Sequence, residues 1–175
     1  MNTIQLYKML KSNINTKKLL MGIYASNRLP QKIKKRPCLV IVNTDPDTEP
    51  SEHWVVMYFS RNGLAEYFDS FGMPPSNNNL ALFLTNNCKK IIFNNKRIQS
   101  LFSNKCGQYC LVYSYFKGKN KSLRYFLSFF DKYFENNDLK VCRMLSYFFC
   151  TTAYKTNRNE KENVCFQTCN PVLSL

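Results

Sequence analysis

The sequence has 175 residues, enough for one domain whose hydrophobic core needs no disulfide bonds. Hydrophobic residues make up 45% of it and aromatic residues 15%, which excludes general disorder. Lysine and arginine number 25 against 11 acidic residues, and the resulting formal charge of +14 favours contact with nucleic acid or another polyanion, although it also suits a merely well-solvated surface.

The first half of the chain predicts one helix followed by strands. Residues 3–14 carry apolar side chains near helical spacing, and Thr3 can cap the start of that helix. Residues 38–43 form a β-branched run, which predicts a buried strand. Residues 53–60 and 64–70 are apolar and aromatic, and the Asn-Gly dipeptide between them is typical of a β-hairpin.

The second half predicts mainly helices. A helix capped by Ser76 is expected to run to about residue 84, and a short strand to cover residues 89–94. Residues 107–116 are apolar nearly all round, which predicts a central buried helix. Amphipathic helical patterns follow at residues 122–134 and 139–149.

Together these elements predict one α+β domain over residues 1–153, with a small central mixed sheet packed against the buried helix. Residues 154–175 are polar and charged and predict a loose C-terminal tail.

The cysteine pattern indicates a reducing compartment. Eight cysteines occur, yet residues 1–10 do not resemble a signal peptide and no apolar stretch is long enough to cross a membrane. We therefore expect a cytosolic or nuclear protein with mostly buried, reduced thiols. The chain has one histidine and no C-x-x-C motif, which disfavours a zinc site and a redox function.

The single histidine, His53, begins the first strand of the predicted hairpin, and Asp69 lies near the end of the second. An imidazole can take the proton of a thiol, and a carboxylate among apolar residues needs a partner such as a ring N–H. Taken alone, each residue also fits a structural role. A two-residue turn would place the two side chains on opposite faces, so their pairing requires an odd-length loop, a bulge or a histidine beyond the regular pairing.

Cys106 opens the predicted buried helix. The positive end of the helix dipole favours a thiolate there, and Gly107 lets a substrate backbone approach. Cys110, one turn further on, is expected in the core. Gln99 can donate its amide to an oxyanion together with the backbone N–H of Cys106. In isolation, Cys106 fits a buried thiol equally well and Gln99 an ordinary loop residue.

These motifs resemble those of the adenovirus protease family, the adenains. The family has a His-Trp pair, a Phe-acid-x-Phe-Gly element, a Gln, and a Cys-Gly-x-x-Cys element seven residues after that Gln. The matching residues here are His53-Trp54, Phe68-Asp69-Ser70-Phe71-Gly72, Gln99 and Cys106-Gly107-Gln108-Tyr109-Cys110. The resemblance covers roughly residues 19–150. The chain differs in carrying Asp where the family often has Glu, and in a His-to-acid separation one residue shorter, which fits a divergent member encoded by another DNA virus or a virus-like element.

The resemblance implies a cysteine endopeptidase with Cys106 as nucleophile, His53 as general base and acid, Asp69 orienting the imidazole, and Gln99 in the oxyanion hole. It implies viral capsid and core precursor proteins as substrates during virion maturation. It also implies activation by DNA and by a disulfide-linked viral peptide, with no metal or small-molecule cofactor. Cys88 matches the family's cofactor-linking cysteine.

The polar tail carries a Cys165-Phe166 pair, which resembles the end of that activating peptide. The tail could therefore supply the cofactor in cis, through a bond between Cys165 and Cys88.

Basic clusters provide candidate DNA contacts, although each could equally be a solvated face. The candidates are Lys32, Lys34, Lys35, Arg36, Lys89, Lys90, Lys96 and Arg97, with a further cluster at Lys117, Lys119, Lys121 and Arg124.

Two alternatives to the viral endopeptidase remain open. One is a protease that removes ubiquitin-like modifiers, because Asp is the usual third member in those related enzymes. The other is a non-catalytic, DNA-binding virion protein with the same fold. We expect a monomer that does not contact membranes and is located in the virion and the host nucleus or cytoplasm.

Overall fold

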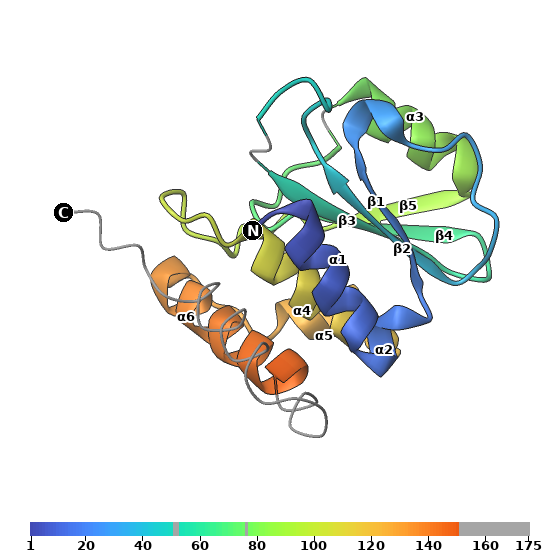
Figure 1. The fold of residues 1–175 in the computed structure, drawn as a ribbon. Coiled ribbons are helices and arrows are strands. Elements are labelled where there is room, and N and C mark those ends of the chain that lie inside the picture. The colour runs from blue at the N-terminus through green and yellow to red at the C-terminus, as the bar shows by residue number, and fades with distance from the viewer. Residues whose placement is uncertain (51–52, 76, 151–175) are drawn as a thin grey trace.

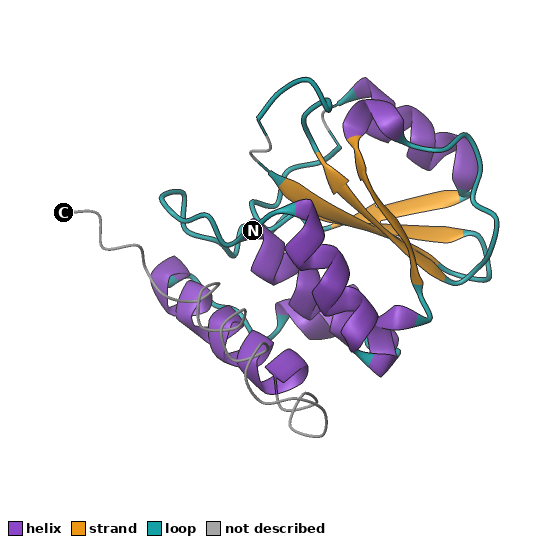
Figure 2. Cartoon of the chain, in the orientation of Figure 1, coloured by secondary structure: helices purple, strands orange, loops and turns teal. Residues whose placement is uncertain are grey.

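The structure, a computed structural model, describes residues 1–50, 53–75 and 77–150. A five-stranded mixed sheet lies at its centre (Figures 1 and 2). The strands are β1 (Leu20–Ala25), β2 (Cys38–Asn43), β3 (Trp54–Phe59), β4 (Leu64–Phe68) and β5 (Lys90–Phe93), adjacent in that order. The outer pairs β1–β2 and β4–β5 are parallel, and the inner pairs are antiparallel. The predicted α+β class is confirmed.

Helices cover both faces of this sheet. They are α1 (Thr3–Ser12), α2 (Ile14–Lys17), the short 3-10 helix η1 (Ser26–Arg28), α3 (Asn78–Asn87), α4 (Cys106–Gly118), α5 (Leu123–Leu127), α6 (Phe134–Leu145) and the π-helical turn η2 (Ser146–Cys150). Figure 2 shows α3 on one side of the sheet, with α1 and α4 on the other.

The alternation of side chains along the strands explains this layering. In β2, Leu39 and Ile41 pack in the core that contains α1, α4 and α6, whereas Val40 and Val42 pack in a second core with α3. All four side chains are 0% exposed, because both faces of the strand are covered by helices. This accounts for the uninterrupted apolar run that predicted β2.

Helix α4 is the central helix that its sequence predicts. Leu111, Val112 and Tyr113 are consecutive and point in different directions, yet each is 0% exposed. The helix packs against β3, α1, α2 and α6, so other elements cover it on all sides. Its first residue is Cys106.

Two predicted helices begin at a different capping residue in the structure. Asn2, rather than Thr3, caps α1, in a reciprocal pair of hydrogen bonds with Gln5. Asn77 caps α3 by accepting from the backbone of Asn79 (2.8 Å), and Ser76 lies outside the described residues. Both corrections replace one capping side chain by an asparagine next to it.

The helix predicted over residues 122–134 is wrong beyond its first turns. Helix α5 ends at Leu127, and α6 begins at Phe134, five residues before the predicted start of the next helix at 139. Between them, Asp131 accepts a hydrogen bond from the backbone of Tyr133 (2.7 Å). Such local bonds from side chain to backbone compete with helical ones, so a turn forms despite the amphipathic pattern.

Strand β1 is absent from the sequence-based predictions, because the glycine in its sequence, Leu-Met-Gly-Ile-Tyr-Ala, weakens the strand pattern. The predicted tail over residues 154–175, including Cys165 and Phe166, lies outside the described residues. Within the part of the chain that the structure describes, no helix is both long and apolar enough to span a membrane.

Candidate active site

The register of the β3–β4 hairpin brings His53 and Asp69 to the same side. The backbone N–H of Ser60 donates to the carbonyl of Leu64 (2.9 Å), which leaves a three-residue loop ending in Gly63 at a φ of 86°. This is the odd-length loop that pairing of the two side chains requires. His53 lies one residue before β3, and its carbonyl accepts from the backbone N–H of Thr44 (3.0 Å), which extends the pairing with β2.

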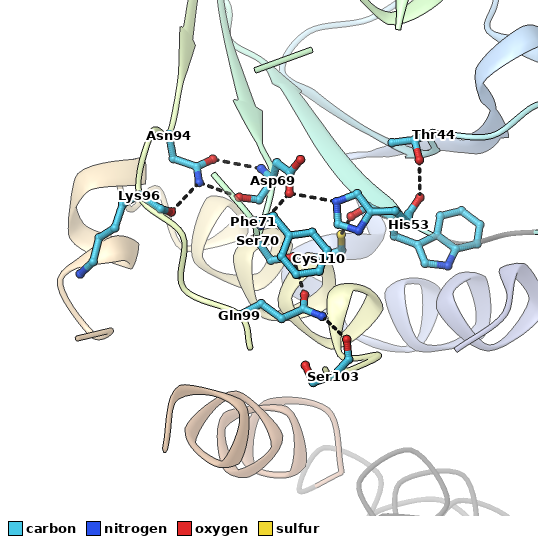
Figure 3. Close-up of polar contacts among 11 residues, drawn as sticks. Thr44, His53, Asp69, Ser70, Phe71, Asn94, Lys96, Gln99, Ser103 and Cys110 are labelled. Carbon is cyan, nitrogen blue, oxygen red and sulfur yellow. Dashed lines mark hydrogen bonds and ion pairs between the residues drawn. The ribbon is translucent and has the colours of Figure 1, made fainter. Parts of the chain in front are cut away.

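His53 and Asp69 form a hydrogen-bonded pair (Figure 3). Nε2 of the imidazole lies 2.9 Å from Oδ1 of Asp69, and the carboxylate is 4% exposed. The same Oδ1 accepts from the backbone N–H of Phe71 (2.7 Å). The Phe71 ring stacks on the imidazole, with 4.9 Å between ring centroids. Position and tilt of the imidazole are therefore both constrained, by a hydrogen bond in one direction and a ring face in another.

Asn94 fixes the backbone of Asp69 from the neighbouring chain segment. Its Oδ1 accepts from the N–H of Asp69 (3.0 Å), and its Nδ2 donates to the carbonyl of Asp69 (2.6 Å) and to that of Lys96 (3.1 Å). Figure 3 shows these bonds on the far side of Asp69 from His53. Sequence reasoning missed Asn94. The one available signal is its place at the end of the short predicted strand 89–94.

Cys106 lies at the start of α4, is buried, and interacts with His53. Burial alone would raise the pKa of this thiol, but the imidazole of His53 and the backbone N–H groups of Trp54 and Gly107 outweigh it, so the pKa is lowered from 9.0. Nδ1 of His53 is buried and has no conventional hydrogen-bond partner among the described residues. Besides Asp69 and the Phe71 ring, the imidazole interacts with the Cys106 thiol.

The pKa of His53 moves in the opposite direction. Burial would lower it, but the hydrogen bond to Asp69 and the neighbouring Cys106 raise it to about 9. A thiol with a lowered pKa next to an imidazole with a raised one shifts the balance toward the thiolate–imidazolium pair. This is the charge state that nucleophilic attack by a cysteine needs.

Gln99 is buried beside the segment that leads to Cys106. Its Oε1 accepts from the hydroxyl of Ser70 (2.6 Å), and its Nε2 donates to the carbonyl of Ser103 (2.7 Å; Figure 3). A primary amide carries two N–H donors, so one remains for another acceptor. These two hydrogen bonds fix the orientation of the Gln99 amide.

Met1 lies against Gly107, where the sequence predicts open space for a substrate. A Cβ placed on Gly107 would be 3.0 Å from Cβ of Met1. The carbonyl of Met1 accepts a hydrogen bond from the indole N–H of Trp54 (3.1 Å). One side of the first turn of α4 is therefore covered by Met1, two residues before α1.

Cys88 lies in a different part of the molecule, directly after α3. Figure 1 shows that this end of α3 is well separated from the start of α4. The thiol donates to the carbonyl of Leu84 (3.0 Å), and burial raises its pKa although Arg36 opposes the shift. It lines an open pocket of about 630 Å³ whose charged lining residues are Lys32, Arg36, Arg61 and Lys89.

Some of the basic residues proposed to contact DNA are exposed, whereas others bind carbonyl groups or an aromatic ring of the protein. Lys34, Lys35, Lys89 and Lys90 are exposed. Lys32 donates to the carbonyl of Asn86 (3.0 Å), Arg36 to those of Ser60 (3.2 Å) and Asn87, and Lys96 to that of Phe130, while Arg97 lies 4.1 Å above the Phe134 ring.

In the third basic cluster, Lys117 is not a surface cation as predicted. It is 6% exposed and forms an ion pair with Glu66 (2.9 Å). Lys119, Lys121 and Arg124 are exposed. A cation at the last turn of a helix that is buried on all sides needs an internal partner, which this pair provides.

The core placement predicted for Cys110 is confirmed. The residue is 1% exposed, its thiol donates to the carbonyl of Trp54 (3.2 Å), and burial raises its pKa well above 9.0. Among the described residues, no group of three or more His, Cys, Asp or Glu side chains is arranged to hold a metal ion.

Comparison with known proteins identifies the fold. No family model and no curated protein matches the chain. The crystal structure of the ASFV pS273R protease matches with a TM-score of 0.58 and 18% identity, over 85% of this chain. This chain spans 66% of that protein, slightly less than two thirds. The central domain of the uncharacterized Lpg1148 protein from Legionella pneumophila matches with a TM-score of 0.50 and 14% identity, over 87% of this chain and 97% of that domain. The chain therefore has the fold of a viral cysteine protease.

Proposed function

We propose that this protein is a cysteine endopeptidase in which Cys106 is the nucleophile, His53 the general base and acid, and Asp69 the residue that orients the imidazole. One observation carries the proposal: His53, hydrogen-bonded to the buried Asp69, lies beside a helix-terminal thiol whose pKa is lowered from 9.0. The shared fold with the ASFV pS273R protease supports it.

The proposed reaction is acyl transfer in two steps. The Cys106 thiolate attacks the scissile carbonyl carbon, and the resulting oxyanion accepts hydrogen bonds from the Cys106 N–H and the free N–H of the Gln99 amide. The imidazolium of His53 gives its proton to the departing amine, which leaves a thioester. Water then loses a proton to His53 and attacks the thioester, releasing the carboxylic acid and regenerating the thiolate–imidazolium pair.

Asp69 acts on this reaction through His53. By accepting from Nε2–H, its carboxylate keeps Nδ1 as the nitrogen that exchanges a proton with the thiol. Phe71 and Asn94 support Asp69 in turn, through its side chain and its backbone.

The proposed substrates are viral capsid and core precursor proteins, and DNA and a peptide bound through Cys88 are proposed activators. The sequence motifs and the fold support the first, and the charge of +14 and the exposed Lys34, Lys35, Lys89 and Lys90 support DNA. Adding a duplex oligonucleotide should accelerate labelling of Cys106. If DNA leaves the labelling rate of Cys106 unchanged at every salt concentration tested, activation by DNA is contradicted.

The catalytic proposal is tested by labelling the purified protein with iodoacetamide across pH and quantifying each cysteine by peptide mass spectrometry. We expect Cys106 to react fastest, well below the ordinary thiol pKa of ~8.5, and to lose that advantage in His53→Ala. Equal labelling of Cys106 and Cys88, with and without DNA, would contradict an activated nucleophile. A panel of fluorogenic ubiquitin-like substrates then separates an endopeptidase from a protease that removes such modifiers.

A further inference from the structure

The segment between Gln99 and Cys106 exposes two large apolar side chains. Leu101 is 63% exposed and Phe102 is 99% exposed, although Gln99 and Cys106 are buried. In Figure 1 this segment is the yellow-green loop that projects from the body just before α4, near the start of α1. Phe102 is thus the most exposed phenylalanine among the described residues, and it lies four residues before the proposed nucleophile.

The base of this loop is anchored, so the exposure belongs to a defined turn. Ser103 N–H donates to the carbonyl of Ser100 (3.2 Å), and the Gln99 amide donates to the carbonyl of Ser103 (2.7 Å). Helix α6 holds the same base, since the Ser100 hydroxyl donates to Glu135 (3.2 Å) and the amide of Asn137 to the carbonyl of Ile98 (3.1 Å). The tip carries Leu101 and Phe102 outward from this fixed base.

These two side chains contribute little to the fold in the positions they occupy. Exposing apolar surface to water is unfavourable, by about 25 cal/mol for each Å². Two apolar side chains beside the proposed chemistry already have partners, since Phe71 stacks on the His53 imidazole and Met1 lies against Gly107. Leu101 and Phe102 are instead exposed, so a polypeptide that places its scissile carbonyl at Cys106 can reach large apolar surface on the turn.

We propose that Leu101 and Phe102 form a substrate-docking turn, which binds a large aliphatic or aromatic side chain of a polypeptide substrate close to the bond that is cut. This inference rests on the proposed endopeptidase function and adds a substrate class to it. Leu101 and Phe102 are specificity-determining residues and take no part in proton transfer or nucleophilic attack.

The test compares the wild type with Leu101→Ala/Phe102→Ala on a proteome-derived peptide mixture, with cleavage sites identified by mass spectrometry. The wild type should enrich large apolar residues at one position near the cut, and the variant should lose that enrichment. For a fluorogenic peptide chosen from the wild-type sites, KM should rise about tenfold in the variant, as expected for losing the burial of a large apolar side chain, with kcat within about twofold.

A matched control is Ile14→Ala/Leu82→Ala, which removes two large aliphatic side chains that are 63% and 59% exposed elsewhere on the surface. It should leave the cleavage profile and KM unchanged. Iodoacetamide labelling of Cys106 separates the two proposals, because this small reagent does not need the turn. Normal labelling with an unchanged cleavage profile in the double variant would overturn the docking turn alone. Slow labelling of Cys106 in the wild type, with no peptide cleaved, would overturn the endopeptidase and with it the docking turn.

Discussion

The first two turns of α4 contain two thiols whose pKa values are shifted in opposite directions. Cys106 and Cys110 are one turn apart and both are buried, yet the pKa of Cys106 is lowered from 9.0 and that of Cys110 is raised well above it. Burial raises the pKa in both cases. Only Cys106 has His53 and two backbone N–H groups beside it, whereas Cys110 contacts a carbonyl. The direction of the shift is therefore set by the polar neighbours, because desolvation is common to both thiols.

The largest expected contrast between the two thiols is in activity. Cys106→Ala should lower peptide cleavage by about 10⁴-fold, because the nucleophile is lost. Cys110→Ala should keep activity within about threefold and lower the free energy of unfolding by about 1–2 kcal/mol, since it removes a buried sulfur and its hydrogen bond. Steady-state cleavage and urea denaturation measure the two effects. A fully active Cys106→Ala variant would contradict the assignment.

Removing the imidazole should make the two thiols alike. In His53→Ala, iodoacetamide labelling of Cys106 at pH 6 should fall by about 100-fold, because burial then acts on its pKa without an opposing charge. Cys110 should stay unlabelled in both folded proteins. Labelling of Cys106 that is independent of residue 53 would show that the helix terminus alone activates the thiol.

The pH dependence of kcat/KM should reflect the ionisation of His53 and of Cys106. His53 has a raised pKa of about 9, so it stays protonated up to that pH, and kcat/KM should fall about tenfold per unit above it as the leaving amine loses its proton donor. On the acid side, kcat/KM should hold until the lowered pKa of Cys106 is passed and the thiolate is protonated. Asp69→Asn should move the alkaline limb to lower pH, because the carboxylate helps to raise the pKa of His53. An alkaline limb that stays in place in Asp69→Asn would contradict the claim that Asp69 raises the pKa of His53.

The smallest expected effect comes from removing Asn94, which holds the backbone of Asp69. Asn94→Ala removes two hydrogen bonds to the Asp69 backbone and should lower kcat by about five- to tenfold with little change in KM, as expected from a loss of about 1 kcal/mol of positioning energy. Asn79→Ala, on the exposed start of α3, is the matched control. An unchanged kcat together with an unchanged pH profile would show that Asn94 is structural only.

Sequence reasoning succeeded where the pattern within a single segment already determines how that segment is buried. The uninterrupted apolar runs predicted β2 and α4, because such runs must be covered on all sides. The hairpin was predictable as well, and the need for His53 and Asp69 to share a face already excluded the two-residue turn. The observed three-residue loop is one of the solutions that this argument allowed.

The failures concern contacts between segments. The role of Asn94 depends on the parallel pairing of β4 with β5, which no local pattern encodes. Residues 122–134 carry a helical pattern, yet the bond from Tyr133 to Asp131 forms a turn there. The packing of Met1 against Gly107 follows from how α1 lies along α4, and the sequence pattern of neither helix specifies it.

That packing extends to both ends of α4, because the N-terminal segment meets this helix at two glycines. At one end Met1 lies against Gly107, and at the other a Cβ on Gly118 would overlap the backbone of Asn15. The segment from Met1 to Asn15 therefore follows α4 from its first turn to its last. A side chain larger than hydrogen at either glycine would push this segment away from the helix, and at Gly107 that change would fall beside the proposed nucleophile.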